Sequence, residues 1–586
     1  MSRLNLSERL KLSGLLAGTV LRRAAARVVQ NPFAYWPRSR TGGDRILIAP
    51  QDLRTADATR AAEIYAGRFA FAGKVVTCDS RTPFEMIAPS DEWLEALHGF
   101  GWLRHLRAAE SGITRANARA LVDEWLNLRR QHPAAVFRPE LAARRLMSFL
   151  SQAPLILHDA DLTFYRRFLR SLTRQARILR RAAFEARDGL PRLQVVMAVA
   201  YAALCLSSQS HHIRGATRRL TEEIERQILP DGGHIGRNPQ ALLDILLDLL
   251  PLRQLYAARN IAPPPALLNA IDRMMPMLRF FRHGDGNFAL FNGMGPTPQD
   301  ELTTILAYDD ARGAPVGHAA HAGYCRLDAT DAVLLMDVGV TPALAVSHEI
   351  HAGCLSFEFS SRFNRIVVNC GQPAANRASW RQPARATAAH STVAFHDTSS
   401  MRFLDGAATR RVLDAVPALP GPRHVEFSRE DDGAAVTVRA SHDGYADRFG
   451  LIHHRQLTLA ADGTRLDGED RFTPAGDGGI DANDAYVVRF HLHPLVRASR
   501  LSDRHSVMLV MPNKDVWTFD AYEHEVELEE SVSLAGVDGP RRTLQLVLSG
   551  TARIMPRVRW LFVNVTPAEA RARRRQQDEP ELPFEP

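Results

Sequence analysis

Two patterns of hydrophobic and polar residues divide this chain into a helical half and a strand-rich half. From about residue 91 to residue 281, apolar residues recur three and four positions apart, which is the spacing of one buried helix face. Runs at 93–106, 164–179 and 242–252 show it clearly, and turn-forming prolines and glycines separate such runs. Six or more consecutive helices joined by short turns predict a helical array or toroid.

Beyond about residue 311, apolar residues alternate with polar ones, as they do in strands with one buried and one exposed face. The runs at 332–339, 355–360, 365–371 and 486–493 follow this pattern, with Gly, Asp and Asn between them. They predict a large antiparallel β-sandwich. The expected fold class is therefore α+β multidomain, with a toroid-like helical domain followed by a β-sandwich domain.

These patterns also set the expected domain boundaries. At 586 residues the chain is too long for one hydrophobic core, so several domains are expected. We assign 1–90 to an N-terminal helical and extended segment, 91–300 to the toroid, and 301–569 to the sandwich. The remaining tail, 570–586, is charged and rich in proline, which predicts disorder.

Composition narrows the function only slightly. The hydrophobic content of 45% and the charged content of 24% are ordinary for a soluble globular protein. A net charge of +8 fits nucleic acid, an anionic membrane surface, an acidic substrate such as a uronate polysaccharide, or simply solvated surface arginines. No zinc-finger, RNA-binding or helix-turn-helix signature stands out, so no nucleic-acid partner is predicted. The oligomeric state is left open.

The N-terminal region predicts an amphipathic surface helix and not a secretion signal. Its apolar stretch, 12–21, is too short to cross a membrane, and Arg22 and Arg23 follow it without a small-residue cleavage site. We expect this helix to rest on a membrane or on the protein itself. The missing signal leaves the cytoplasm open as a location. Five scattered cysteines without a CxxC spacing argue against a disulfide framework.

The strongest candidates for functional residues are three histidines in the segment from residue 348 to residue 393. His348 and His351 are close in sequence, and His390 follows about forty residues later, with short strand-like runs between them. Neutral imidazole is the commonest protein metal ligand and the usual proton shuttle near neutral pH. The segment therefore predicts a metal site or a proton-transfer site built on a rigid sheet.

The same segment carries the motifs H-A-x-x-L-S-F-E, V-V-N-C-G and A-A-H-S-T-V, after a helical domain with R-Q-I-L-P-D-G-G-H. In this combination the chain resembles the heparinase II/III family of polysaccharide lyases. The resemblance implies an incomplete (α/α) toroid packed against a β-sandwich, and a location in the cell envelope or periplasm. It also implies β-elimination in an acidic polysaccharide, in which a base removes the C5 proton of a uronate and an acid protonates the departing O4.

The resemblance assigns three residues to a metal. His351 and His390 match the family's metal-binding histidines, and the third ligand, commonly an aspartate, falls on Asn369. The expected cofactor is zinc or another divalent metal. Because asparagine offers a carbonyl oxygen without charge, we expect weaker metal binding than in the family.

The family's catalytic positions match less well. Its catalytic histidine falls on Glu349, and His348 lies one residue further back and could substitute. The toroid asparagine has no counterpart in 189–195, and the tyrosine expected after the D-G-G-H turn is missing. Tyr445 could replace that tyrosine if its loop reaches the cleft.

A second group of candidates follows the D-G-G-H turn itself. His234 could act in catalysis, while Arg237 and Asn238 could hold the substrate carboxylate, with Arg237 as the neutralising cation. The alternative is a helix-capping turn with solvated polar groups.

Two functional hypotheses remain from the sequence. The first is a lyase that cleaves an acidic polysaccharide by β-elimination. The second is a protein that keeps the fold, has lost the catalytic groups, and binds an anionic glycan during export or envelope assembly. Metal-dependent hydrolysis is a weaker third reading, because no dense cluster of carboxylates and histidines is visible.

Overall fold

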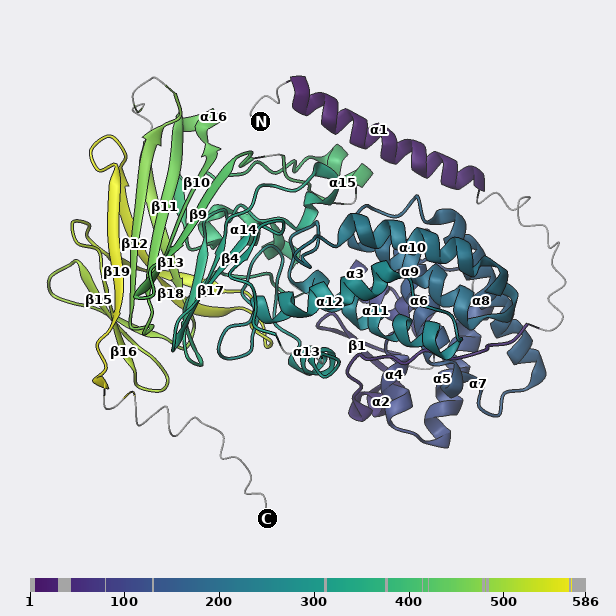
Figure 1. The fold of residues 1–586 in the computed structure, drawn as a ribbon. Coiled ribbons are helices and arrows are strands. Elements are labelled where there is room, and N and C mark those ends of the chain that lie inside the picture. Colours follow the sequence, from purple (N-terminus) through teal and green to yellow (C-terminus); the bar gives the residue numbers. More distant parts are fainter. Residues whose placement is uncertain are drawn as a thin grey trace, which may run out of the picture.

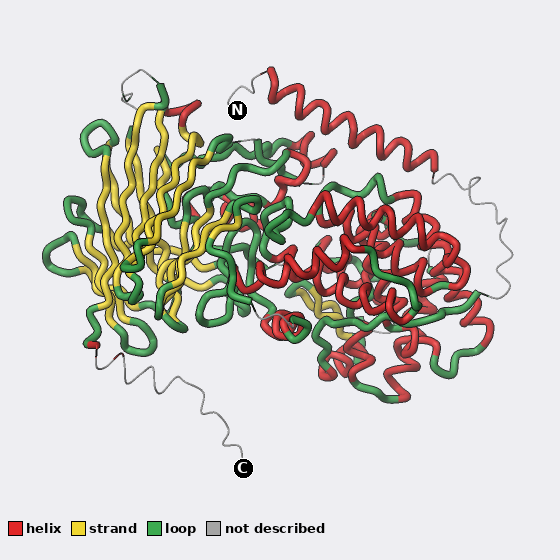
Figure 2. The backbone as a smooth tube through the Cα atoms, viewed as in Figure 1, coloured by secondary structure: helices red, strands yellow, loops and turns green. Residues whose placement is uncertain are grey.

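The structure, a computed structural model, describes residues 6–29, 44–78, 81–128, 131–309, 313–374, 378–413, 415–419, 421–476, 480, 484–568 and 571. A helical domain and a two-sheet β-domain lie side by side, and a separate N-terminal helix runs along the outside (Figures 1 and 2). The tail predicted to be disordered lies outside the described residues, apart from Arg571.

The helices are α1 (Leu6–Val29), α2 (Ala58–Tyr65), α3 (Asp91–Gly99), α4 (Leu103–Ala108), α5 (Gly112–Asn127), α6 (Pro139–Ser151), α7 (Ala153–Leu157), α8 (Leu162–Ala182), α9 (Leu190–Cys205), α10 (Ile213–Gln227), α11 (Gln240–Ala258), α12 (Pro265–Phe280), α13 (Gln299–Leu306), α14 (Arg381–Arg385), α15 (Ala407–Leu413) and α16 (Ala446–Phe449). A short hairpin of β1 (Arg68–Phe71) and β2 (Lys74–Thr77) belongs to the helical domain and was not predicted.

Helix α9 forms the centre of the helical domain. Twelve of its residues, from Leu193 to Cys205, are buried, and it packs against α6, α8, α10 and α11. A helix that is apolar on all sides is stable only when other helices surround it. By contrast, α8 buries one face and exposes arginines on the other, as an outer helix does.

The remaining strands are β3 (His318–Ala319), β4 (Tyr324–Asp328), β5 (Ala332–Asp337), β6 (Phe357–Ser361), β7 (Asn364–Val368), β8 (Val393–Phe395), β9 (Val425–Asp431), β10 (Ala435–Tyr445), β11 (Leu451–Ala460), β12 (Arg465–Pro474), β13 (Ala485–Leu492), β14 (Arg497–Arg500), β15 (Ser506–Val510), β16 (Val516–Asp520), β17 (Glu527–Ser533), β18 (Arg541–Thr551) and β19 (Arg557–Asn564). They form two antiparallel sheets, one ordered β14-β15-β16-β19-β12-β11-β10-β9 and the other β17-β18-β13-β7-β6-β5-β4-β3, with β8 paired to β13.

The two sheets enclose an apolar core, as alternation in the sequence predicted. Strand β11 alternates buried and partly exposed residues along its whole length. Across the sandwich, the rings of Phe357 and Trp560 stack with centroids 5.5 Å apart. The fold class predicted from the sequence, a toroid-like helical domain before a large antiparallel sandwich, is confirmed.

The segment that joins the two domains, residues 284–296, is largely buried and not a free linker. His283, just before it, contacts Glu358 and Ser360 of β6 through its two ring nitrogens, at 3.0 and 2.9 Å. The backbone N–H of Leu290 also donates to Glu358. This carboxylate is fully buried and joins the two domains, so it does not face water.

Helix α1 rests against the folded chain, one of the two arrangements expected for it. Glu8 forms ion pairs with Arg402 and Arg423 of the β-domain, at 3.3 and 3.9 Å. Leu15 and Thr19 line a cavity of about 710 Å³ together with residues of both domains. None of the helices in the described ranges combines the length and the apolar character needed to cross a bilayer.

Candidate functional site

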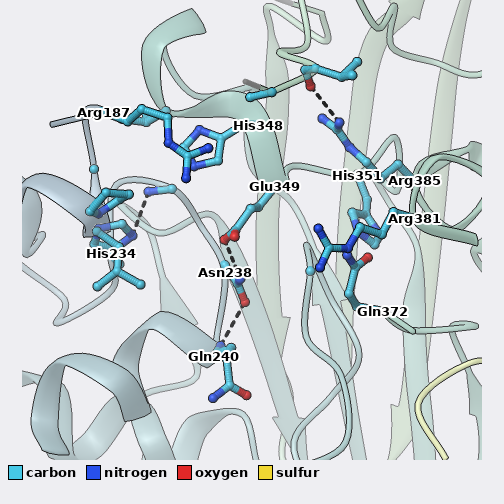
Figure 3. A pocket seen from close by; sticks show the side chains of 18 of the residues that line it. Arg187, His234, Asn238, Gln240, His348, Glu349, His351, Gln372, Arg381 and Arg385 are labelled. Carbon is cyan, nitrogen blue, oxygen red and sulfur yellow. Dashed lines mark hydrogen bonds between the residues drawn. The ribbon is translucent and has the colours of Figure 1, made fainter. Parts of the chain in front are cut away.

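A cavity of about 620 Å³ opens where the two domains meet. The helical domain contributes the loop before α9, the turn from residue 234 to residue 240, and α11. The β-domain contributes the 3₁₀ turn Leu344–Glu349 and the segments around residues 372–385 and 410–416. Figure 3 shows side chains from both domains pointing into this space. We refer to it below as the cleft.

Glu349 and His348 are neighbours in the cleft, and the charge of each shifts the pKa of the other. Burial raises the pKa of Glu349, but the neighbouring His348 and a hydrogen bond from Asn238 outweigh burial and leave the pKa below its ordinary value. Burial lowers the pKa of His348 against the opposing charge of Glu349. Both residues line the cleft, and Glu349 is held ionised, while the proton-transfer role expected for the pair stays a prediction.

Arg385 fixes the turn that presents this pair. It donates to the backbone carbonyls of Ser347 and Ile350, which flank the pair, at 3.1 and 2.8 Å. Arg385 also donates to the backbone carbonyl of Val416, at 2.7 Å, in another segment that lines the cleft. Burial lowers its pKa to about 10, and its guanidinium packs 4.4 Å from the ring centre of Phe403. One buried arginine therefore joins two backbone segments at the site, the turn that carries His348 and Glu349 and the segment at Val416.

His234 lines the cleft, but both of its ring nitrogens are engaged within the protein. Nδ1 accepts from the N–H of Gly236 at 3.1 Å, and Nε2 donates to Gln227 at 2.9 Å. Burial lowers its pKa to about 4, so the ring is neutral near neutral pH. These bonds assign His234 to holding the turn, and they disagree with the catalytic role predicted for it.

Arg237 does not reach the cleft, and the substrate-binding role predicted for it is wrong. All five N–H groups of its buried guanidinium donate inside the protein, to four backbone carbonyls and to Asp337 at 2.6 Å. Gly339 makes this possible, because a Cβ there would lie 2.3 Å from Arg237 Nη2. Arg237 is thus a buried residue of the helical domain that binds the β-domain.

Asn238 does line the cleft. Its Nδ2 donates to Glu349 at 2.7 Å, and its Oδ1 accepts from the N–H of Gln240, so it positions the carboxylate and begins α11. Tyr445, in contrast, is fully buried in the sandwich core and donates to the carbonyl of Val393 at 2.6 Å. Its loop does not reach the cleft, and the catalytic role predicted for it is wrong.

His351 and His390 meet at the rear of the cleft. His351 Nδ1 and His390 Nε2 lie 3.1 Å apart, and His390 Nδ1 is 2.8 Å from the carbonyl of Ala386. Gly353 permits this contact, since a Cβ there would lie 2.6 Å from the ring of His390. The prediction that these two rings converge is confirmed by the structure.

The residues present do not fit the metal predicted for this place. Within the described part of the chain, no group of three or more His, Cys, Asp and Glu side chains is arranged to hold a metal ion. The third predicted ligand, Asn369, uses its only oxygen to accept from the N–H of Ser391 at 3.0 Å.

Sequence reasoning missed the arginines of the cleft. Arg187, Arg381, Arg385 and Arg410 all line it, and Figure 3 shows Arg381 beside His351 and Gln372. They are far apart in sequence and lie among many other arginines, so no local signal marks them. The cleft is therefore rich in cations, which favours an anionic ligand.

Three further polar residues of the cleft were also missed. Gln194 lies in the stretch where the family asparagine was sought, and Gln240 follows Pro239, where the tyrosine was expected. Asp244 lies one helical turn after Gln240, and burial raises its pKa to about 6. None of the described residues that line the cleft is a tyrosine.

Comparison with known proteins gives a family match and several structural neighbours. Residues 311–561 match the family described as Heparinase II/III-like, C-terminal. The fold is similar to Heparinase III, with a TM-score of 0.68 and 13% identity, covering 90% of this chain and 87% of that one. It is also similar to a heparan sulfate lyase HepC mutant from Pedobacter heparinus, with a TM-score of 0.61 and 14% identity, covering 94% and 90% of the two chains.

One relative has a different kind of name. FtsZ-localized protein C from Caulobacter vibrioides is 29% identical over 523 residues, which is 87% of this chain and 89% of the relative. The similarity therefore extends over both domains.

Proposed function

We propose that the cleft of this chain, whose residues 311–561 match the family described as Heparinase II/III-like, C-terminal, binds an acidic polysaccharide without cleaving it. The observation that carries the proposal is the composition of the cleft. Four arginines line it, while its described lining contains no tyrosine and the expected toroid amide and tyrosine positions hold Gln194 and Gln240. The cleft thus keeps groups that attract an anion and lacks the usual proton donor.

The charge of the ligand follows from where these arginines lie. The side chains of Arg187, Arg381 and Arg410 are 41%, 45% and 58% exposed, so they remain accessible to a ligand. Their ion pairs within the protein are with partly exposed acids, which a ligand carboxylate or sulfate can replace at small cost. Planar guanidinium groups bind such anions through paired hydrogen bonds.

Loss of the proton donor argues against elimination. A general acid or base typically contributes about a hundred- to ten-thousandfold to rate, provided its pKa is near the working pH. Glutamine cannot transfer a proton, and the ionised Glu349 would oppose the approach of a uronate carboxylate. A ligand can still bind, because the arginines outnumber the two acids of the cleft, Glu349 and Asp244.

The binding test is titration calorimetry with heparin, heparan sulfate, alginate, polygalacturonate and neutral dextran. Binding of at least one acidic polymer but not dextran is expected, together with weakening at high salt. The double variant R381Q/R410Q should weaken binding by roughly three- to thirtyfold, the range for losing two partly exposed charge pairs. The matched control, R214Q/R497Q, removes two exposed arginines outside the cleft and should bind as the wild type does.

One observation favours a rebuilt lyase as the second candidate. Glu349 is an ionised carboxylate that could act as a base, and Asp244, with a pKa near 6, is protonated often enough to act as an acid. The absorbance of unsaturated uronate separates the candidates. A steady rise that E349Q abolishes would establish elimination and overturn the proposal of binding alone.

The name of the relative adds a proposal about location. We infer that this protein acts in the cell envelope. Two observations support this: a relative is named for its localization with FtsZ, and the cleft suits an acidic glycan. Co-sedimentation of the purified chain with FtsZ polymers tests part of this. Recovery in the supernatant at every protein concentration would count against a direct link to FtsZ.

A further inference from the structure

We propose that Asn369 excludes a metal ion from the place where His351 and His390 meet. The hydrogen bond between the two rings then supports the side of the cleft that His351 lines, in place of a metal. The inference is independent of the ligand that the cleft binds. It concerns how the backbone around His351 and His390 is held in place, which the metal site predicted from the sequence would have done through a metal ion.

The orientation of the Asn369 amide is the first observation. Its oxygen must face Ser391, because only the oxygen can accept from the Ser391 N–H, 3.0 Å away. Its nitrogen therefore points the other way, and among the described residues Asn369 Nδ2 has no hydrogen-bond partner. An amide NH₂ group has no lone pair to give a metal. Turning the amide over would leave the buried Ser391 N–H facing a donor.

The tautomers of the two rings follow from their hydrogen-bond partners. A carbonyl only accepts, so His390 Nδ1 carries the proton that goes to Ala386, and His390 Nε2 is an acceptor. His351 Nδ1 must then donate to it across 3.1 Å. The two rings satisfy each other without a metal, and the remaining nitrogen of His351 lies beside the side chain of Gln372 at the cleft.

The carboxylate beside Asn369 is also committed. Glu358 accepts from the N–H groups of Asn369 and Leu290 at 2.8 and 3.0 Å, and from His283 at 3.0 Å. It holds the segment between the domains and is fully buried. It is therefore not available to replace the missing aspartate as a metal ligand.

The wild-type protein gives the first test. Purified without chelator and passed through a desalting column, it should contain less than ~0.1 zinc per chain by elemental analysis, where a structural site would retain about one. Its melting temperature should be the same with and without EDTA. About one tightly held zinc, nickel or manganese per chain, or a fall in melting temperature on chelation, would overturn the proposal.

The substitution N369D gives the second test, because an aspartate could accept from Ser391 with one oxygen and keep a second, charged oxygen as a metal ligand. This variant should melt lower than the wild type in metal-free buffer and be restored by zinc, taking up about one zinc per chain. The control N369D/H390Q lacks one ring and should show no restoration. A folded N369D variant that ignores zinc would show that Asn369 is not what excludes the metal, and the wild-type metal content decides the question if N369D does not fold.

Discussion

Asn238 of the helical domain donates to Glu349 of the β-domain across 2.7 Å, so the two domains meet on one carboxylate. The bond connects the D-G-G-H turn to the turn Leu344–Glu349, which are about a hundred residues apart in sequence. It also helps to keep Glu349 ionised. The geometry of the cleft and the docking of the domains are therefore coupled through this contact.

The substitution N238A should weaken domain docking. Removing the amide leaves the Glu349 carboxylate without one of its donors, and because this side chain is exposed to the solvent of the cleft, the loss should be about 1 kcal/mol. The pKa of Glu349 should rise, because the donor that favours its charged form is lost. Thermal unfolding at pH 7 should show a lower midpoint, while N269A, at an exposed position of α12, serves as the control. An unchanged midpoint would show that the contact contributes nothing.

Stability should fall as the pH drops below 6.5, because buried histidines are held neutral. Burial lowers the pKa of His98 to about 3 and that of His234 to about 4. A histidine with a lowered folded pKa binds its proton more readily when unfolded, so its stabilisation is present above about pH 6.5 and is lost as pH falls toward the folded pKa. The loss is about 1.4 kcal/mol per histidine per pH unit.

Urea unfolding at pH 7, 6 and 5 measures this dependence. The variant H234Q should show a shallower fall in stability than the wild type, since glutamine does not titrate. Equal slopes for the two proteins would mean that His234 is not the group responsible.

Arg385 should not be replaceable by lysine. Its planar group reaches three carbonyls in different directions, and a lysine ammonium on a flexible stem cannot reproduce that arrangement. We expect R385K to lose about 1–3 kcal/mol of stability, the range for leaving buried acceptors unsatisfied. Glycan binding should weaken too, because the turn carrying His348 and Glu349 is released. If R385K binds and melts like the wild type, the positive charge alone is what matters.

Hydrophobic periodicity was enough to predict both domains, because helices and strands bury their apolar residues at different spacings. It could not predict the β1–β2 hairpin, whose strands have only four residues each, too short for a pattern to stand out. The convergence of His351 and His390 was predicted from the motifs around them. Their mutual hydrogen bond was not, because the sequence does not show which ring nitrogen faces which.

The errors in the predicted site have one physical cause, which is burial. Arg237 and Tyr445 are polar residues near suggestive motifs, and the sequence could not reveal that each finds partners in the interior. Asp337, which forms an ion pair with Arg237, lies 100 positions away in the chain. The cleft arginines, by contrast, could be placed only by the tertiary fold, since residues 187, 381 and 410 share no local pattern.

Helix α1 should bind anionic membranes weakly. Leu10 and Leu21 are 66% and 69% exposed, while Arg9 and Lys11 are exposed near Leu10. Exposed apolar side chains beside basic ones are typical of helices that lie in a membrane interface. Flotation with vesicles containing phosphatidylglycerol should recover the wild type, and L10S/L21S should be recovered less. Equal recovery of both proteins would contradict a role for this face of α1.

The substitution Y445F should separate stability from function. The phenol is fully buried and donates to Val393, so its removal leaves that carbonyl without a donor and should cost about 1 kcal/mol. Because Tyr445 lies in the sandwich core and not in the cleft, the affinity for an acidic glycan should stay the same. Calorimetric titration and thermal unfolding of the same preparation measure both quantities. A large loss of affinity with an unchanged melting temperature would show that Tyr445 contacts the ligand, contrary to its position in the sandwich core.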